Sequence, residues 1–578
     1  MDIKPKRART SAFDALLRRI EMVPASDRVL LRILFFAVIG SLIFTIFAFN
    51  DGFSSITATK GGTITEAVLG TPRFVNPVLA NTRADQDVTA LVYSGLLKIS
   101  TEGELVPDLA SSITVADDGL TYNIVLRDNV KFHDGEEFSA KDVIFTIQLA
   151  QDADLKSPLR GNWSGVTVEE IGTHELNVVL EEPYAPFIEN FTLGIMPSHL
   201  WSSLPIEQLP FSQLNTEPIG TGPFMLKNAR RDQSGIITNY ELTAYGNSQN
   251  TPNIQTFEFM FFDQESDIID ALNEEIVDAT SYISNENLSL VSDKYELHTK
   301  TLPRVFGIFF NQNRSAVLRD DAVREALSIA LQRETIIDEV LNGYGVPIDS
   351  PIASIKNEIE SEEDNLSLSS STIEQATKIL LDSGWEQNEL GFWEKEIDKE
   401  DVTLSVTLRT SNTPLFESTL NQIAEFWREL GVEVVTEQFE QTGLVQSVIR
   451  PRDFEALLFG LDMSRSYDLY PFWHSSQKDD PGLNIAQYTN LSVDALLEEA
   501  RTTTDTNKRD QLFNDASEII SKEYPAVLLF QPEFIYVVSN EVTVTLPDRI
   551  GKSSDRFDNT SEWHTRSDVL WSTFQDDM

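Results

Sequence analysis

Apolar residues recur at helical spacing in several parts of the 578-residue chain. Between residues 322 and 343 they return every three or four positions and stop at Gly343, which predicts a helical segment with one buried face. Ser139 and Asp142 have the spacing of a capping box just before another such run, and residues 372–384 form a third. These patterns predict helices that pack against a core.

Two other patterns predict strands. Apolar and polar residues alternate from Val402 to Leu408, a helical pattern of about 15 residues follows, and residues 432–439 form a second strand pattern. A strand, a helix and a strand in this order form a βαβ unit, which implies a parallel sheet. Residues 256–263 are almost continuously apolar, as in a strand buried on both faces. We therefore expect an α/β protein, with more than one sheet because the length exceeds what one core supports.

One apolar run near the N-terminus is of a different kind. Residues 33–49 contain no charge, and with residues 29–31, past an Arg32 that can reach the headgroups, they give about 21 residues, enough to span a bilayer. No A-x-A-like cleavage site follows, so residues 29–49 are expected to be an uncleaved transmembrane signal anchor; the alternative is a cleaved signal peptide. The first 32 residues carry eight basic and four acidic side chains. The positive-inside rule then places the basic segment 1–28 in the cytoplasm and the remaining body outside.

Composition and charge exclude several classes of protein. The chain is 41% hydrophobic and 24% charged, as packed proteins are. It contains no Cys, which excludes disulfides, thiolate metal sites, thiol catalysis and a lipid-modified cysteine. Its net charge of −46 repels phosphate, so no nucleic-acid partner is expected.

Catalytic and cofactor motifs are missing or incomplete. The six His show no H-E-x-x-H pattern and no close pairing, so no metal site is expected. Residues 551–553 resemble the end of a phosphate-binding loop, but Leu546 stands where its first Gly should be. Ser475 and Lys478 form an isolated S-x-x-K pattern without its usual companion motifs. We expect a binding protein, not an enzyme, and no cofactor.

Residues 105–150 resemble, nearly position by position, the signature of the family 5 extracellular solute-binding proteins. These are the oligopeptide-, dipeptide- and nickel-binding receptors of ABC importers. The resemblance covers roughly residues 60–540. Further matches occur in the family's order at residues 61–63, 93–97, 218–224, 310–311, 320–345, 380–385 and 484–500.

The resemblance implies a two-lobed periplasmic-binding-protein-like fold of type II with an extra inserted subdomain, here preceded by one transmembrane helix. Lobe I is expected at residues 60–303, with the inserted subdomain at about 98–215, lobe II at 304–528, and a return to lobe I at 529–570. The motifs themselves are mostly structural: Asp134 and Gly135 form a turn pattern, and residues 220–223 a Gly/Pro turn that enters a strand.

The resemblance also implies where a ligand is held. Peptide-binding members pair the backbone of an extended ligand with protein main chain and its ammonium with an Asp, the logic of strand addition. The corresponding residues from lobe I are Asn81, Thr82, Arg83 and Ala84, and those from lobe II are Phe459, Gly460, Leu461 and Asp462.

The identity of the ligand-pairing Asp stays open. Asp468 is the alternative to Asp462, although Leu469 follows it where the family usually has Pro, and either carboxylate could instead belong to a surface loop. Trp473, in an aromatic cluster, is a candidate cleft wall or a core residue.

The expected function is that of a membrane-anchored solute-binding protein that captures peptides between two lobes and delivers them to an ABC importer. Its expected partners are an oligopeptide ligand, the permease subunits and the membrane, and the protein is expected to be a monomer. It would be a single-pass protein of the cell membrane, with its body on the extracellular or periplasmic face. The alternatives are a peptide sensor or signalling receptor, a nickel-chelate-binding member of the family, and an extracellular hydrolase without a recognisable motif.

Overall fold

A computed structural model describes residues 24–571 except 117, 247–250, 353–370, 398, 504 and 566. Most of the predicted cytoplasmic segment 1–28 lies outside the described residues. The chain divides into two compact units, one of residues 60–565 and one made from the two ends of the chain.

The smaller unit joins residues from both ends of the sequence. Helix α2 (Ala25–Phe53) continues directly into strand β1 (Ser54–Ala58), which pairs antiparallel with β23 (Ser567–Trp571). Large apolar side chains along α2 are exposed, among them Phe36 and Phe44 at 68% and 74%. Within the described part of the chain, no helix meets the combination of length and apolarity needed to cross a membrane.

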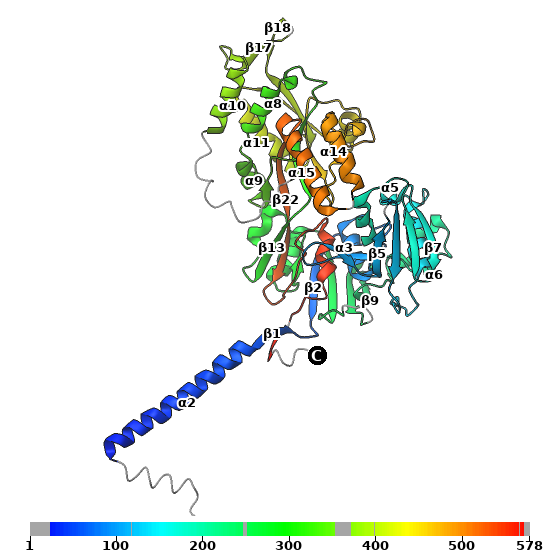
Figure 1. The fold of residues 1–578 in the computed structure, drawn as a ribbon, viewed down its shortest axis with the longest axis vertical. Helices are drawn as coiled ribbons and strands as arrows, with labels where there is room; N and C mark the ends of the chain where they lie inside the picture. The colour runs from blue at the N-terminus through cyan, green and yellow to red at the C-terminus, as the bar shows by residue number, and fades with distance from the viewer. Residues whose placement is uncertain are drawn as a thin grey trace, which may run out of the picture. The chain divides into compact units, whose positions relative to one another are not determined.

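The larger unit is organised around one mixed sheet in which β22 (Ala526–Ser539) is the shared strand (Figure 1). One half of the sheet runs from β22 through β14 (Arg304–Phe310), β21 (Ala456–Asp462) and β19 (Ser405–Ser411) to β20 (Glu433–Phe439). The other half runs through β12 (Ala279–Thr280), β2 (Thr63–Leu69), β11 (Thr256–Phe262) and β10 (Ile237–Ala244) to β9 (Phe224–Arg231). Strands β13 (Tyr295–Thr301) and β15 (Gly345–Pro347) also pair with β22.

We call the half that contains β2 lobe I. Its core includes Ile64, Phe257, Tyr536 and Trp563, and its helical elements are α3 (Arg83–Val92), α7 (Glu265–Asn273), η4 (Asn285–Leu290) and η8 (Ser553–Asn559). The expected strand 256–263 is β11, but only Phe257 and Phe259 on one face are buried. The expectation of burial on both faces was wrong, because Met260 and Phe262 on the other face pack against the core but stay partly exposed.

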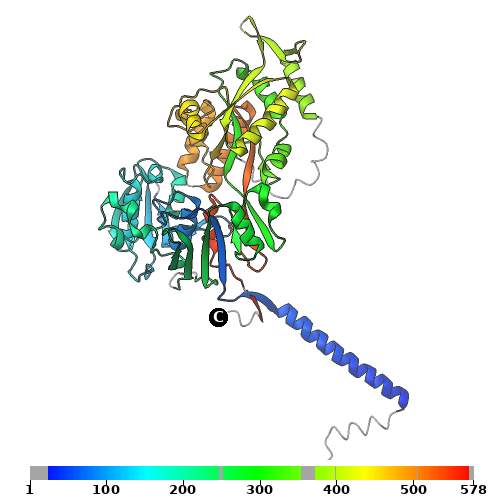
Figure 2. The ribbon, with the colours of Figure 1, turned by 180° about the vertical axis from the view of Figure 1, so that it is seen from behind.

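Inserted in lobe I is a second sheet, which we call the small-sheet subdomain (Figure 2). Its strands are β5 (Ala110–Val115), β6 (Thr121–Leu126), β8 (Glu175–Val179) and β7 (Thr167–Gly172), and β3 (Leu97–Ile99) pairs with β4 (Leu105–Pro107) nearby in sequence. The helical elements are α4 (Ala140–Gln151), α5 (Arg160–Trp163), η1 (Ala185–Thr192), α6 (Ser198–Trp201), η2 (Ile206–Phe211) and η3 (Gln213–Asn215). The predicted capping box is confirmed, since Asp142 Oδ2 accepts from Ser139 N at 2.9 Å.

We call the half that contains β14 lobe II. Helices α8 (Asp321–Ile329), α9 (Arg333–Leu341), α10 (Ser371–Asp382) and α11 (Pro414–Leu430) share one core with the sheet. A second core lies with α12 (Gln441–Leu444), η6 (Val445–Ile449), α13 (Tyr470–Trp473), α14 (Leu491–Thr502) and α15 (Thr506–Glu523). Short elements η5 (Val317–Arg319), η7 (Ser475–Gln477), β16 (Glu386–Gln387), β17 (Trp393–Ile397) and β18 (Glu400–Thr403) complete it.

The predicted βαβ unit of lobe II is confirmed as β19, α11 and β20, with the two strands parallel. Two details differ from the pattern. The expected strand 402–408 is divided between β18 and β19, and the helical segment 322–343 is two helices. At the break in that segment, Arg333 donates to the carbonyls of Ile348 and Leu528 at 3.0 and 2.7 Å, tertiary contacts that periodicity does not reveal.

The loop at Gly220–Pro223 packs directly against the end of α3. A Cβ at Gly222 would lie 2.5 Å from the carbonyl carbon of Val92, so only glycine allows this approach. His133 holds the same loop, because its Nδ1 accepts from Gly220 N at 3.3 Å and its Nε2 lies 3.1 Å from Gly222 O. Burial lowers the pKa of His133 to about 4, so the ring is neutral and Nε2 donates. Residue 133 and residues 220–223, which both belong to motifs that resemble family 5, therefore contact each other in the fold.

Candidate functional site

Two cavities lie among lobe I, the small-sheet subdomain and lobe II. Cavity 1 has a volume of about 430 Å³ and cavity 2 about 1330 Å³. Both are lined by Glu189 of η1 and by Arg465, which follows β21. A cleft between domains is a frequent location for a ligand site.

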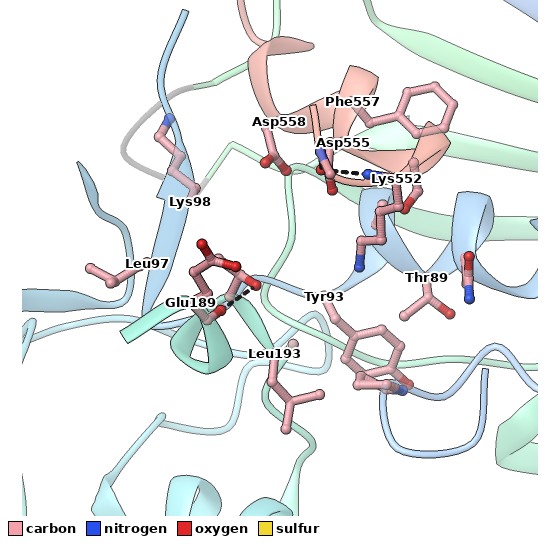
Figure 3. A pocket seen from close by; sticks show the side chains of 18 of the residues that line it. Thr89, Tyr93, Leu97, Lys98, Glu189, Leu193, Lys552, Asp555, Phe557 and Asp558 are labelled. Carbon is pink, nitrogen blue, oxygen red and sulfur yellow. Dashed lines mark hydrogen bonds between the residues drawn. The ribbon is translucent and has the colours of Figure 1, made fainter. Parts of the chain in front are cut away.

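Cavity 1 is built from segments far apart in the sequence (Figure 3). Helix α3 contributes Thr89 and its C-cap Tyr93, and strand β3 contributes Leu97 and Lys98. The short helix η1 contributes Glu189 and its C-cap Leu193. The short helix η8 contributes its N-cap Lys552 together with Asp555, Phe557 and Asp558. Lobe II contributes Asp462, Ser464 and Arg465. The cavity therefore needs both lobes and the subdomain.

Carboxylates outnumber basic groups around cavity 1. The acidic residues are Asp108, Glu189, Asp462, Asp555 and Asp558, and the basic ones are Lys98, Arg465 and Lys552. Burial, followed by the nearby Asp555 carboxylate, raises the pKa of Asp558 to about 7. The excess of carboxylates suits a ligand with a positively charged group, although the protonated form of Asp558, which burial favours, reduces the negative charge of the lining.

Cavity 2 is balanced in charge. Its acidic lining residues are Glu104, Glu189, Asp349, Asp510 and Glu518, and its basic ones are Arg333, Arg465, Arg509, Lys522 and Arg549. A polar ligand that extended from cavity 1 into cavity 2 would pass from a lining with more acidic than basic residues to a lining with equal numbers of both.

Asp462 is the last residue of β21, and its side chain is 61% exposed. Its Oδ2 lies 3.4 Å from Nε of Arg304, itself 46% exposed, and its Oδ1 lies 3.4 Å from Ser464 N. Such an exposed, long ion pair is weak. The carboxylate is thus available on the wall of cavity 1.

The strand that ends at Asp462 has one edge only partly paired. Strand β14 pairs with β21 along its whole length, from Ala456 to Asp462. Strand β19 pairs with it at Ala456 and Leu457, and Thr410 Oγ1 of β19 donates to Leu458 O at 2.9 Å; among the described residues, no strand pairs on that edge with Phe459 to Asp462. Phe459, Gly460 and Leu461 line neither cavity with their side chains; Phe459 stacks on Phe416, with ring centroids 6.4 Å apart, and Leu461 is buried.

The lobe I segment predicted to contact ligand forms the start of α3. Thr82 is the N-cap and makes a capping box with Asp85. Arg83 donates to Ser281 O at 2.8 Å and lies over the Tyr282 ring, and Ala84 is buried. Asn81, Thr82, Arg83 and Ala84 line neither cavity, whereas their neighbours Ala80 and Gln86 line cavity 1. The T-x-x-D spacing was the sequence signal that could have revealed this helix start.

Asp468 and Trp473 do not line the cavities. Asp468 is 3% exposed, and its Oδ2 lies 3.3 Å from Nε of Arg501. Burial raises the pKa of Asp468, although Arg501 acts in the opposite direction. Trp473 is 2% exposed and packs against Phe309 and Tyr488 in the core of lobe II. The structure therefore separates Asp462 from the other candidates of lobe II.

The cavity residues Glu189, Arg465, Asp555 and Asp558 were not predicted. Arg465 and Asp555 are 90 positions apart, and Glu189 belongs to the inserted subdomain. No local pattern marks any of them. Among the described residues, no group of three or more His, Asp or Glu is arranged to hold a metal ion.

A Ser–His–carboxylate arrangement occurs in lobe II, away from both cavities. His474 Nδ1 lies 2.8 Å from Ser476 Oγ, and its Nε2 lies 3.3 Å from Glu498. The ring also accepts from Ser476 N and thereby caps the short helix η7. Its role is structural.

Comparison with known proteins agrees with this geometry. The family model "Bacterial extracellular solute-binding proteins, family 5 Middle" matches residues 104–481. The oligopeptide-binding protein AppA of Bacillus subtilis (strain 168) is 28% identical over 488 residues, which are 82% of this chain and 87% of AppA.

Two solved structures share the fold. AppA from Bacillus subtilis in complex with a nonapeptide has a TM-score of 0.61 and 24% identity, covering 88% of this chain and 99% of AppA. NikZ from Campylobacter jejuni in complex with Ni(L-His) has a TM-score of 0.62 and 24% identity, covering 87% and 99%. The chain therefore belongs to family 5 of the bacterial extracellular solute-binding proteins, a family of binding proteins and not of enzymes.

Proposed function

We propose that this protein binds peptides between its lobes and delivers them to an ABC importer. The observation that carries the proposal is Asp462, an exposed carboxylate that lines an acidic cavity at the end of a strand with an unpaired edge. A peptide has the matching chemistry, because its ammonium can pair with the carboxylate and its main chain can extend the strand.

In this proposal the ligand ammonium pairs with Asp462 and the ligand backbone lies along Phe459 to Leu461. Asp468 is a poorer partner for an ammonium, since it is buried and already paired with Arg501. AppA, to which the chain is similar, is named an oligopeptide-binding protein, which supports the same ligand class.

We further propose that the two lobes close on the ligand about β22. The chain passes from lobe I to lobe II between β13 and β14, at residues 302–303, and returns along β22. Gly345 pairs with Pro532, and Thr301 with Glu533, so the pairing partners of β22 change at this point. Closure requires a ligand that binds the closed arrangement more tightly than the open one.

The membrane anchor is part of the same proposal. Its support is the uncharged run 33–49, the basic residues before it and the exposed apolar side chains of α2. The body would then stand on the extracellular or periplasmic side. N-terminal sequencing of detergent-extracted protein should give a start before residue 29, whereas a start near residue 50 would show cleavage.

Calorimetry tests the ligand class. Protein unfolded and refolded to remove bound ligand is titrated with tri-alanine, with a mixed peptide library and with nickel–histidine. We expect heat from peptides at a stoichiometry of one. Heat from nickel–histidine and none from peptides would contradict the proposal and favour a metal-chelate ligand.

A further inference from the structure

Arg465 and Glu189 line both cavities, and we treat this shared lining as the wall between them. Its Nη2 lies 2.5 Å from Asp555 Oδ2, and the two side chains are 13% and 4% exposed. Asp555 is itself fixed, because the same oxygen accepts from Gly551 N at 2.7 Å and Lys552 N at 3.0 Å. Arg465 therefore reaches from lobe II to η8 of lobe I and ends on an immobile acceptor.

Glu189 completes this wall from the third side. It lines both cavities, and Ser466, next to Arg465, lines cavity 2. Burial raises the pKa of Glu189, with Arg465 acting against this. Side chains from lobe I, the small-sheet subdomain and lobe II thus surround the Arg465 guanidinium.

The Arg465 guanidinium is held on one side only. Its Nε is buried and has no hydrogen-bond partner among the described residues. A buried donor without a partner carries a desolvation cost that a ligand carbonyl could remove. Arg465 also follows Asp462 by three positions, so an extended peptide that begins at Asp462 meets this side chain early.

The volumes of cavities 1 and 2 differ about threefold, so the wall between them affects the length of the ligand that can bind. Cavity 1, at about 430 Å³, lies within the range of small-ligand pockets, whereas cavity 2, at about 1330 Å³, exceeds that range. A peptide ligand confined to cavity 1 would be short. A longer peptide has to enter cavity 2.

We propose that Arg465 is a gate that sets the length of the ligand. Paired with Asp555, it closes cavity 1 around a short peptide; displaced from Asp555, it joins cavity 1 to cavity 2 and admits a longer one. This inference rests on the proposed peptide-binding function and adds to it a specificity-determining residue.

The test compares two ligands on three proteins. Tri-alanine and a nonapeptide that begins with three alanines are titrated into wild type, Arg465→Ala and Arg450→Ala. Arg450 is the control because its side chain is 62% exposed, pairs with Asp480 at 3.7 Å and lines neither cavity.

The readout is the ratio of the two dissociation constants. Arg465→Ala should shift the ratio in favour of the nonapeptide by about tenfold or more, equivalent to about 1.4 kcal/mol, and Arg450→Ala should leave it unchanged. Arg465→Lys keeps a positive charge opposite Asp555, so its ratio of dissociation constants should be close to that of wild type. This variant is measured as well in case Arg465→Ala does not fold.

Two other outcomes are distinguishable. Equal weakening of both peptides by Arg465→Ala would overturn the gate, because it would mean that Arg465 only supports closure or binds every ligand alike. Failure of wild type to bind either peptide would contradict the proposed function itself.

Discussion

The carboxylate of Asp468 lies 3.3 Å from Nε of Arg501, whose guanidinium lies between the rings of Tyr184 and Tyr470 at 4.4 and 4.2 Å. Tyr184 belongs to the small-sheet subdomain and the other three residues to lobe II. This cluster therefore joins two parts of the molecule, and it engages Asp468 in a structural role.

Asp462→Asn should weaken the binding of free peptides by about 30-fold to several thousand-fold, since removal of one partner of an ammonium–carboxylate pair in a closed cleft costs about 2–5 kcal/mol. Calorimetry with tri-alanine measures the effect. N-acetylated peptide, which has no ammonium, should bind wild type and variant about equally weakly. Normal affinity of Asp462→Asn for free peptide would exclude Asp462 as the ligand partner.

Asp468→Asn should lower the free energy of unfolding by about 1–3 kcal/mol, because its amide NH2 would face either Tyr470 N, from which Oδ1 now accepts at 3.1 Å, or Nε of Arg501, and a donor cannot replace the acceptor in either place. Urea denaturation is the measurement, with the exposed Asp479→Asn as matched control, for which we expect a change below about 0.5 kcal/mol. If Asp468→Asn were as stable as wild type but had lost peptide affinity, the roles of Asp462 and Asp468 would be exchanged.

Asp558 should make stability depend on pH. Its pKa is about 7 in the folded protein, against an ordinary value of 3.8, so folding favours its protonated form. The stabilisation from this proton is complete below pH 4 and is lost as the pH rises to 7. When the pH is raised from 4 to 8, the free energy of unfolding of Asp558→Asn should therefore increase relative to that of wild type by up to about 4 kcal/mol. The measurement is urea denaturation of both proteins at pH 4 and at pH 8. If the difference in free energy of unfolding between variant and wild type were the same at the two pH values, the prediction would be contradicted.

Gly222→Ala should destabilise the fold by about 2–3 kcal/mol, because its Cβ would lie 2.5 Å from the carbonyl carbon of Val92 and the backbone would have to move. Thermal unfolding gives the comparison. Gly161→Ala is the matched control, since a Cβ there has no atom within 4 Å and lies in helix α5. Equal melting temperatures for the two variants would show that the loop at Gly222 adapts.

Much of the fold could be predicted because its signals are local. The capping box at Ser139, the alternation before and after α11 and the glycine after α10 each depend on residues a few positions apart. Asp462 was named for a different reason, because the resemblance to family 5 implies a ligand contact at Phe459 to Asp462; the structure places it at the end of β21.

The rest of the site depends on contacts between distant segments. Arg465 has a role only because η8 brings Asp555 to it, and Glu189 only because the inserted subdomain adjoins lobe II. Asn81 to Ala84, where the resemblance implies a ligand contact, form the start of α3 and line neither cavity, so their contact with a ligand stays a prediction.

Strand β22 has a consequence for how the chain is made. It lies between β14 of lobe II and β12 of lobe I, and it spans residues 526–539 of a chain of 578. A ribosome adds residues from the N-terminus, and domains usually fold as they emerge. Here neither half of the sheet has its shared strand until about nine-tenths of the polypeptide exists. Both lobes thus finish folding together and late, which leaves the chain without its complete sheet during most of its synthesis and suits a polypeptide that is threaded through a membrane before it folds.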